Sequence, residues 1–278
     1  MVAAKDTFIT IQMSPILNHL TGSNPVNRKI ASQQAGLLIV NADDWGRDTE
    51  TTNRILDCVL HGSVSSASAM VFMEDSERAA ALACAKGVDV GLHLNFTTPF
   101  RTGCTARLAN HQSRLGHFLS RNRLSQMYFH PGLASSFRYV VAAQLEEFRR
   151  LYDSEPARID GHHHMHLCAN VVFAGLLPAG TITRRNFSFQ SGEKSAVNRL
   201  YRRFIDNILA KRHPLTDFFY SLPPLEPSER LTRILILAKH FVVEVETHPV
   251  NPEEYSFLMA DKIFNQIGDV PIASSYRL

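Results

Sequence analysis

The clearest hydrophobic signal is the short apolar run LLIV at residues 37–40, which passes directly into the polar sequence NADD. A continuous apolar run of this length is typical of a strand buried on both faces of a parallel sheet. Similar runs alternate along the chain with segments of helical periodicity, a pattern that predicts an α/β fold with a parallel sheet or barrel. The expected strands are 37–40, 67–72, 88–94, 157–160 and 241–245, and the expected helices are 51–61, 76–85, 136–152 and 231–241.

Three segments lack this alternation. Residues 1–35 are rich in polar residues and are interpreted as a poorly ordered extension, which leaves 36–278 as one domain. Residues 96–135 are punctuated by Pro and Gly, and we expect a long irregular loop over the active face. Residues 184–212 carry eight Lys or Arg against two acidic residues. This basic segment is interpreted as a solvated helix face or lid, with attraction of an anionic ligand as the alternative.

Composition narrows the class of protein. The 278 residues are 45% hydrophobic and 20% charged, which suits a globular chain. A net charge of +3 is too small to imply a nucleic-acid partner, and no apolar run is long enough to span a bilayer. The four cysteines match no zinc motif or disulfide scaffold, and no secretory signal is recognised, so we expect a cytoplasmic location.

Polar clusters follow four of the expected strands. Asp43 and Asp44 follow the first, His93 lies at the end of the third, the sequence HHHMH begins at His162, and His248 follows the last. Carboxyl ends of parallel strands lie at the same face of a sheet or barrel. We therefore expect these residues, distant in sequence, to be neighbours in space.

Two imidazoles and one carboxylate form a three-ligand site for a divalent cation and leave a position for water. Zn²⁺ suits nitrogen and oxygen ligands best, and Mg²⁺ is the alternative if carboxylates and water dominate. A second carboxylate beside the cation can accept the proton of the water. The spacing alone does not decide which histidines bind the cation.

The same residues closely resemble the YdjC-like carbohydrate deacetylase family, and the resemblance covers about residues 36–275. That family has a (β/α) barrel-like fold related in architecture to polysaccharide deacetylases. The matching motifs occur in the family's order and are LLIVNADDWG at 37–46, VGLHLNFT at 90–97, RIDGHHHMH at 158–166 and VEVETHPV at 243–250.

The resemblance implies a role for each cluster. Asp44, His93 and His162 would bind one divalent metal ion, either Mg or Zn. Asp43 would be the general base, and His248 would be the general acid that protonates the leaving amine.

A second group of residues is implied to bind substrate or to support the metal ligands. The group comprises His164, His166, Trp45, Asn95 and Arg184.

Two residues of the motifs depart from the family pattern. Trp45 stands where Phe is usual, and Gly161 stands where Ser is common.

The resemblance implies a hydrolase that removes an acetyl group from an N-acetylated sugar or oligosaccharide by attack of a metal-bound water. Two alternatives stay open: a metal-dependent hydrolase of another amide or a phosphoester, and a non-catalytic carbohydrate-binding relative. The expected partner is a small carbohydrate, with neither nucleic acid nor an integral membrane segment. A homodimer is compatible with the sequence.

Overall fold

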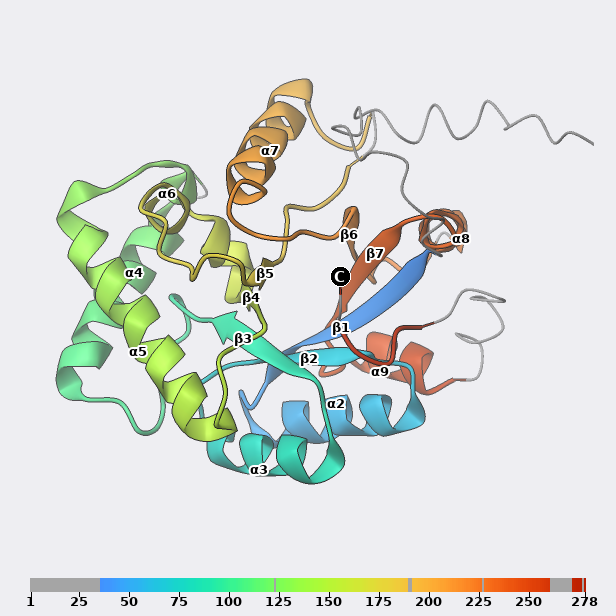
Figure 1. Cartoon of the computed structure of the whole chain (residues 1–278), viewed down its shortest axis with the longest axis horizontal. Helices are drawn as coiled ribbons and strands as arrows, with labels where there is room; N and C mark the ends of the chain where they lie inside the picture. The colour runs from blue at the N-terminus through green and yellow to red at the C-terminus, as the bar shows by residue number, and fades with distance from the viewer. Residues whose placement is uncertain (1–35, 123, 190–191, 227, 261–271, 277) are drawn as a thin grey trace, which may run out of the picture.

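The computed structural model describes residues 36–122, 124–189, 192–226, 228–260, 272–276 and 278 (Figure 1). The extension expected at residues 1–35 lies outside the described residues. No helix in the described ranges is both long and apolar enough to cross a membrane.

Seven strands form one sheet in the order β5-β4-β3-β2-β1-β7-β6, and every neighbouring pair is parallel. The predicted α/β class with a parallel sheet is confirmed. The strands are β1 (Leu37–Trp45), β2 (Ser66–Ala69), β3 (Val90–Leu94), β4 (Arg158–Gly161), β5 (Ile182–Thr183), β6 (Phe218–Ser221) and β7 (Val242–Thr247).

Helices connect the strands and cover the outer face of the sheet (Figure 1). Asp48 caps α2 by accepting a hydrogen bond from the Thr51 amide, and Gly62 ends the helix with a φ of 84°. The α-helices are α2 (Thr49–His61), α3 (Ser76–Lys86), α4 (Ala106–Arg121), α5 (Ala134–Tyr152), α6 (Ala169–Phe173), α7 (Ala196–Leu209), α8 (Ser228–Ala238) and α9 (Pro252–Met259). The short 3-10 helices are η1 (Ser125–Met127), η2 (Pro131–Leu133) and η3 (His162–Leu167).

The expectation of an irregular loop over residues 96–135 is wrong, because α4 occupies residues 106–121. Thr105 caps this helix, and its buried face includes Leu108, Leu115 and Leu119. Gly116, which suggested a loop, lies inside the helix at a close contact. A Cβ at this position would lie 3.2 Å from the Phe96 carbonyl oxygen. The glycine therefore permits close packing of α4 rather than a turn.

The sheet curls so that its two edge strands, β5 and β6, approach each other (Figure 1). The chain that follows β5 bonds directly to β6. The Ser188 amide donates to the Phe219 carbonyl oxygen at 2.8 Å, and the Phe219 amide donates to the Ser188 hydroxyl at 3.1 Å. The architecture is therefore an incompletely closed barrel, in agreement with the barrel-like fold that the resemblance implies.

The two faces of the strands differ in chemistry. On β7, Val243 and Val245 pack outward into the hydrophobic core formed with the helices, and Glu244 and Glu246 alternate with them. On β1, Asn41 points inward: it donates hydrogen bonds to Asp43 of the same strand and to Ser68 of β2, and it accepts one from Ser66 of β2. The barrel interior is thus buried but polar, although the LLIV run of β1 is apolar.

The segment 272–276 closes the amino end of the barrel. Tyr276 is buried against Ile39, and its hydroxyl donates to Glu244 Oε2 at 2.6 Å. Its amide donates to Asp89 Oδ2 at 2.6 Å, and its ring lies 5.0 Å from the guanidinium carbon of Arg158. One end of the polar interior is therefore sealed, and access is from the carboxyl ends of the strands.

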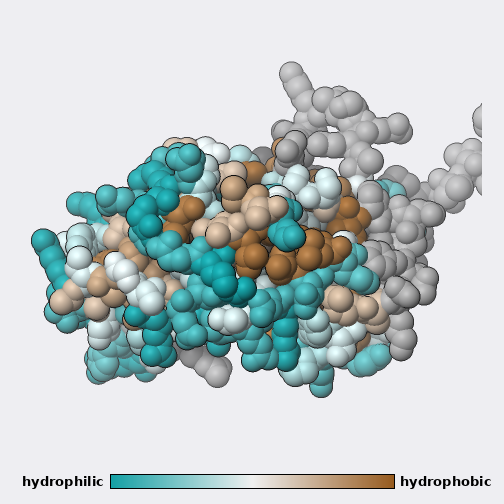
Figure 2. Space-filling model, turned by 90° about the horizontal axis from the view of Figure 1, so that it is seen from below, coloured by the Kyte–Doolittle hydropathy of each residue, from teal (hydrophilic) through white to brown (hydrophobic). Residues whose placement is uncertain are grey.

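The face seen from below carries α2 and α3 (Figure 2). Hydrophilic residues cover most of this face and surround a hydrophobic area near its middle (Figure 2).

Gly91 on β3 gives a direct test of packing inside the barrel. A Cβ at this position would lie 2.3 Å from Cγ of Arg158, so Gly91→Ala should lower the free energy of unfolding by about 1–3 kcal/mol. Urea denaturation of Gly91→Ala, Arg158→Ala and the double variant measures the coupling. The free energy of unfolding should fall less in the double variant than the sum of the decreases in the two single variants. Additive decreases would refute the steric explanation.

Candidate metal centre

The Asp43–Asp44 pair reaches one site because the backbone leaves regular strand geometry there. Strict alternation would point the two side chains to opposite faces of β1. Asp44 instead has a φ of 74°, and the register with β2 shifts between Ala42 and Trp45. Left-handed conformations are unfavourable for residues other than glycine and concentrate at functional sites. The turn brings the carboxylates of Asp43 and Asp44 both within reach of His93.

Asp44, His93 and His162 form a buried cluster whose ligating atoms all lie within 4.8 Å of one another. Asp44 Oδ1 is 2.9 Å from His162 Nδ1 and 3.4 Å from His93 Nε2. The sequence prediction that these three residues meet is confirmed by this geometry.

The cluster fits a divalent cation in two respects. Asp44 Oδ1 is buried and accepts no hydrogen bond within the described part of the chain, so its lone pairs are available to an ion. Two imidazoles and one carboxylate are also a donor set that suits Zn²⁺, and a site richer in oxygen would suit Mg²⁺.

Asp160 orients His93, and sequence reasoning missed it. Its Oδ1 lies 2.8 Å from His93 Nδ1, and its Oδ2 accepts a hydrogen bond from Ser68 at 2.6 Å. This contact directs His93 Nε2 towards Asp44, the arrangement by which a carboxylate fixes the ring of a metal-binding histidine. The signal was present in the motif RIDG, where an acidic residue interrupts a buried strand.

Arg184 lies at the centre of the interior, with its side chain only 1% exposed. Two of its nitrogens bond to the two carboxylate oxygens of Asp43 at 2.7 and 2.8 Å. It also lies 2.8 Å from Asp160, 2.7 Å from Glu244 and 3.4 Å from Glu246. A substrate cannot reach this side chain, so Arg184 supports the site from beneath.

The charges of this network shift the acidities of its members. Burial raises the pKa of Glu246 well above its ordinary value, and the nearby Asp43 charge adds to this effect. Burial also opposes ionisation of Asp160, but Arg184 and His93 outweigh it and lower that pKa. For His93, burial is outweighed by Asp160 and Asp43, which raise its pKa to about 10. The interior therefore carries excess negative charge and favours a cation.

The histidines of η3 point in different directions, because His163 and His164 have left-handed φ values of 53° and 57°. His164 Nε2 lies 3.6 Å from Glu246, and its ring packs 4.6 Å from that of Phe187. His166 is fully buried, and its Nε2 lies 3.0 Å from the Arg184 carbonyl oxygen. Neither His164 nor His166 belongs to the ligand cluster of Asp44.

His248 follows β7 and is half-buried. Glu254 holds this turn, because its Oε2 accepts hydrogen bonds from the Thr247 hydroxyl at 2.7 Å and from the His248 amide at 2.9 Å. The imidazole is close enough to contribute to the lowered pKa of His163, which burial and His162 principally cause. His248 thus lies near the histidines of η3, at the carboxyl ends of the strands.

Trp45 and Asn95 are close to the site residues in sequence, but their side chains are not exposed to solvent. Trp45 is fully buried in the hydrophobic core. Asn95 is also fully buried, and its side-chain oxygen accepts hydrogen bonds from the Thr97 and Thr98 amides at 3.1 and 2.9 Å. The contacts that the structure shows for them are packing by Trp45 and, for Asn95, hydrogen bonds that shape the turn after β3, and a role in binding substrate or supporting the metal ligands stays a prediction.

Comparison with known proteins identifies the family. A family model described as YdjC-like protein matches residues 37–262. The chain belongs to the YdjC-like protein family. Its match spans β1 to α9 and includes every residue of the Asp44 cluster.

Two bacterial relatives resemble this YdjC-like chain at moderate identity. A chitooligosaccharide deacetylase of Serratia marcescens is 35% identical over 136 residues, which are 47% of this chain and 51% of that protein. A chitooligosaccharide deacetylase of Enterobacter is 33% identical over 186 residues, or 66% of this chain and 68% of the relative. The aligned part thus spans about half the length of the first relative and two thirds of the second.

A solved structure supports the fold. A protein of Enterococcus faecalis described as a cellobiose-phosphate cleavage protein superposes with a TM-score of 0.61 at 15% identity. The superposition covers 86% of this chain and 97% of that chain. At this identity the likeness concerns the fold alone.

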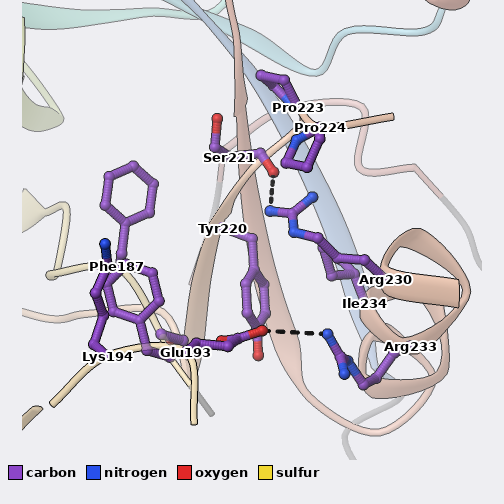
Figure 3. Close-up of a pocket in the computed structure, with 12 residues that line it drawn as sticks. Phe187, Glu193, Lys194, Tyr220, Ser221, Pro223, Pro224, Arg230, Arg233 and Ile234 are labelled. Atoms are coloured by element: carbon purple, nitrogen blue, oxygen red, sulfur yellow. Dashed lines mark hydrogen bonds and ion pairs between the residues drawn. The ribbon is translucent and has the colours of Figure 1, made fainter. Parts of the chain in front are cut away.

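A cavity of about 340 Å³ adjoins the site of the YdjC-like domain on the side of β6 (Figure 3). Phe187 lines the cavity and also packs against His164, and Ser221 pairs in register with Glu246 of β7. Arg230 donates hydrogen bonds to the Ser221 and Leu222 carbonyl oxygens. The cavity therefore continues from the carboxyl end of β7 towards α8.

His166 predicts how stability depends on pH. Burial lowers its pKa in the folded protein to about 4, against about 6.5 in the unfolded chain. Protonation therefore favours unfolding. The neutral His166 contributes its full stability at pH values above about 6.5, the pKa in the unfolded chain, and this contribution is lost as the pH falls towards 4. From pH about 6.5 to about 5, this group should remove about 2 kcal/mol of the free energy of unfolding.

The test is urea denaturation of wild type and His166→Gln, which keeps a hydrogen-bond donor for the Arg184 carbonyl oxygen. The variant should lose about 2 kcal/mol less than wild type over that interval. Equal losses in the two proteins would show that His166 does not titrate as described.

Proposed function

We propose that this chain is a metal-dependent carbohydrate deacetylase that removes an acetyl group from an N-acetylated sugar or oligosaccharide. The observation that carries the proposal is the buried cluster of Asp44, His93 and His162 with a second carboxylate, Asp43, beside His93. The relatives named chitooligosaccharide deacetylase support the substrate class.

Asp44, His93 and His162 would hold one divalent cation, with Zn²⁺ and Mg²⁺ as the candidates. When bound, such an ion supplies polarisation of the amide carbonyl and increases the acidity of water. The protein contributes the rigidity of the donor set, because Asp160 fixes the ring of His93 and Arg47 bonds to the other oxygen of Asp44 at 3.0 Å.

Asp43 is the proposed general base. Arg184 donates one hydrogen bond to each of its carboxylate oxygens. Asn41 donates a further hydrogen bond to Oδ1 at 2.8 Å. This leaves Oδ2 with one protein donor and a free lone pair that can accept a proton from the attacking water. The fixed orientation removes the entropic cost of placing the base during the reaction.

His248 is the proposed general acid. It follows β7, which lies on the other side of β1 from β3, which carries His93, and from β4, which His162 follows. Its attachment through Thr247 and Glu254 fixes the backbone while the half-buried imidazole remains accessible. A protonated His248 would donate its proton to the departing amine.

The cavity beside β6 is the proposed site for the rest of the sugar chain. Its wall combines the aromatic rings of Phe187, Phe189 and Tyr220 with charged groups, including Arg230 and Lys194. Apolar rings with a few converging polar groups are typical of sites for small ligands. Phe187 also packs against His164 of η3, which places the cavity beside the segment that carries His162.

Asp43→Asn separates the base from the metal ligands. The variant should keep its metal, measured by elemental analysis, and lose about a thousandfold in acetate release from N-acetylglucosamine oligomers. Asp44→Asn should lose metal and activity together, and the exposed Asp57→Asn is the matched control that should change neither. Near-normal turnover of metal-loaded Asp43→Asn would remove Asp43 as the base.

Asp160→Asn tests the support of His93. Loss of the carboxylate partner should weaken Zn²⁺ binding by about 10- to 100-fold, because the imidazole loses both orientation and basicity. Competition with a chromophoric chelator measures the affinity, and thermal melting checks the fold. An unchanged Kd for Zn²⁺ in the folded variant would contradict the role given to Asp160.

A further inference from the structure

Large apolar side chains are exposed mainly on one part of the surface. Of the eleven such side chains in the described residues, eight lie on α6, on α7 and between residues 124 and 129. Helix α6 contacts both η1 and α7, and Asn170 on α6 exchanges two hydrogen bonds with the backbone of His130. These segments therefore form one continuous surface, at the upper left of Figure 1. We call it the apolar patch.

Helix α7 provides the best-defined part of the patch. Its inner face packs Ile205 and Leu209 into a small core with α6. Its outer face exposes Val197, Leu200 and Phe204, with exposed fractions of 78%, 68% and 52%. A surface helix needs only its inward stripe to fold, so a second stripe facing solvent indicates a binding surface.

Aromatic side chains extend the stripe beyond α7. Phe173 on α6 is 49% exposed, and its ring centroid lies 6.5 Å from that of Phe204. Tyr128 and Phe129 are also exposed, and they directly precede His130, whose backbone bonds to Asn170 of α6. Aromatic residues of this kind are enriched where proteins enter the interface between water and lipid.

The segments that surround the patch are basic. Helix α4, which contacts η1, carries three arginines and no acidic residue. Helix α7 carries three arginines and one acidic residue, Asp206, which is buried and paired with Arg185. Contact between two copies of this patch would bring like charges together, which disfavours self-association. An anionic surface complements these charges.

We propose that the apolar patch docks this protein onto an anionic lipid membrane. Helix α7 lies in the plane of the interface, with Val197, Leu200 and Phe204 entering the acyl boundary and the arginines contacting lipid phosphates. The attachment is peripheral, and it does not depend on the proposed deacetylase activity.

The test is co-sedimentation of the full chain with vesicles of phosphatidylcholine, either alone or with about a third phosphatidylglycerol. Wild type should bind the vesicles that contain phosphatidylglycerol, with affinity falling as salt is added, and should not bind phosphatidylcholine alone. Leu200→Asp with Phe204→Asp should reduce binding by about tenfold or more, because both the apolar contact and the charge complementarity are lost.

Leu60→Asp is the matched control. Leu60 is 61% exposed on α2, a helix that carries Glu50 and Asp57, so its substitution should leave vesicle binding unchanged. Thermal melting should show that all variants remain folded. The proposal is overturned if wild type binds neither vesicle or if Leu60→Asp impairs binding equally. It is also overturned if the wild type is a dimer that does not bind lipid and the α7 variants are monomers.

Discussion

The buried guanidinium of Arg184 is the interaction on which the site depends. It contacts four carboxylates that come from β1, β4 and β7 and would otherwise repel one another inside the barrel. Removing one partner of a buried charge network leaves the others unpaired, at a cost of about 3–5 kcal/mol. Arg184 also orients Asp43, while Asp160 links the same network to His93. The same contacts of Arg184 therefore stabilise the interior and fix the geometry of the site.

The candidate metal cluster contains a carboxylate oxygen, Oδ1 of Asp44, that the Arg184 network does not pair. Five carboxylates face the interior around one central guanidinium, and the Asp44 oxygen nearest the two histidines accepts no hydrogen bond in the described chain. The left-handed backbone of Asp44 and of η3 puts these groups in place. Such conformations are unfavourable alone and persist where the surrounding packing determines them. Burial, and after it the charge of Asp43, raise the pKa of Glu246, and a divalent cation would balance the negative charge of these carboxylates.

Much of this arrangement could be predicted from the sequence. Polar clusters after apolar strands correctly indicated which residues meet, because parallel strands place their carboxyl ends together. The support of the site was harder to predict. Asp160 reaches His93 through the pairing of β3 with β4, and Arg184 reaches Glu244 of β7 across the interior, so both contacts depend on the order and curvature of the strands. The complete burial of Trp45 in the hydrophobic core was also not visible in the motif that contains it. The helix α4 was missed because its glycine resembled a loop signal although it serves close packing.

The most direct measurement of the central claim is X-ray absorption spectroscopy of the protein loaded with one equivalent of Zn²⁺. The account predicts nitrogen and oxygen ligands, with outer-shell scattering from two imidazole rings. The same spectrum should be obtained from Asp43→Asn, because Asp43 is held by Arg184 and stands apart from the ion. Sulfur ligands, absence of imidazole scattering, or loss of the site in Asp43→Asn would contradict the account.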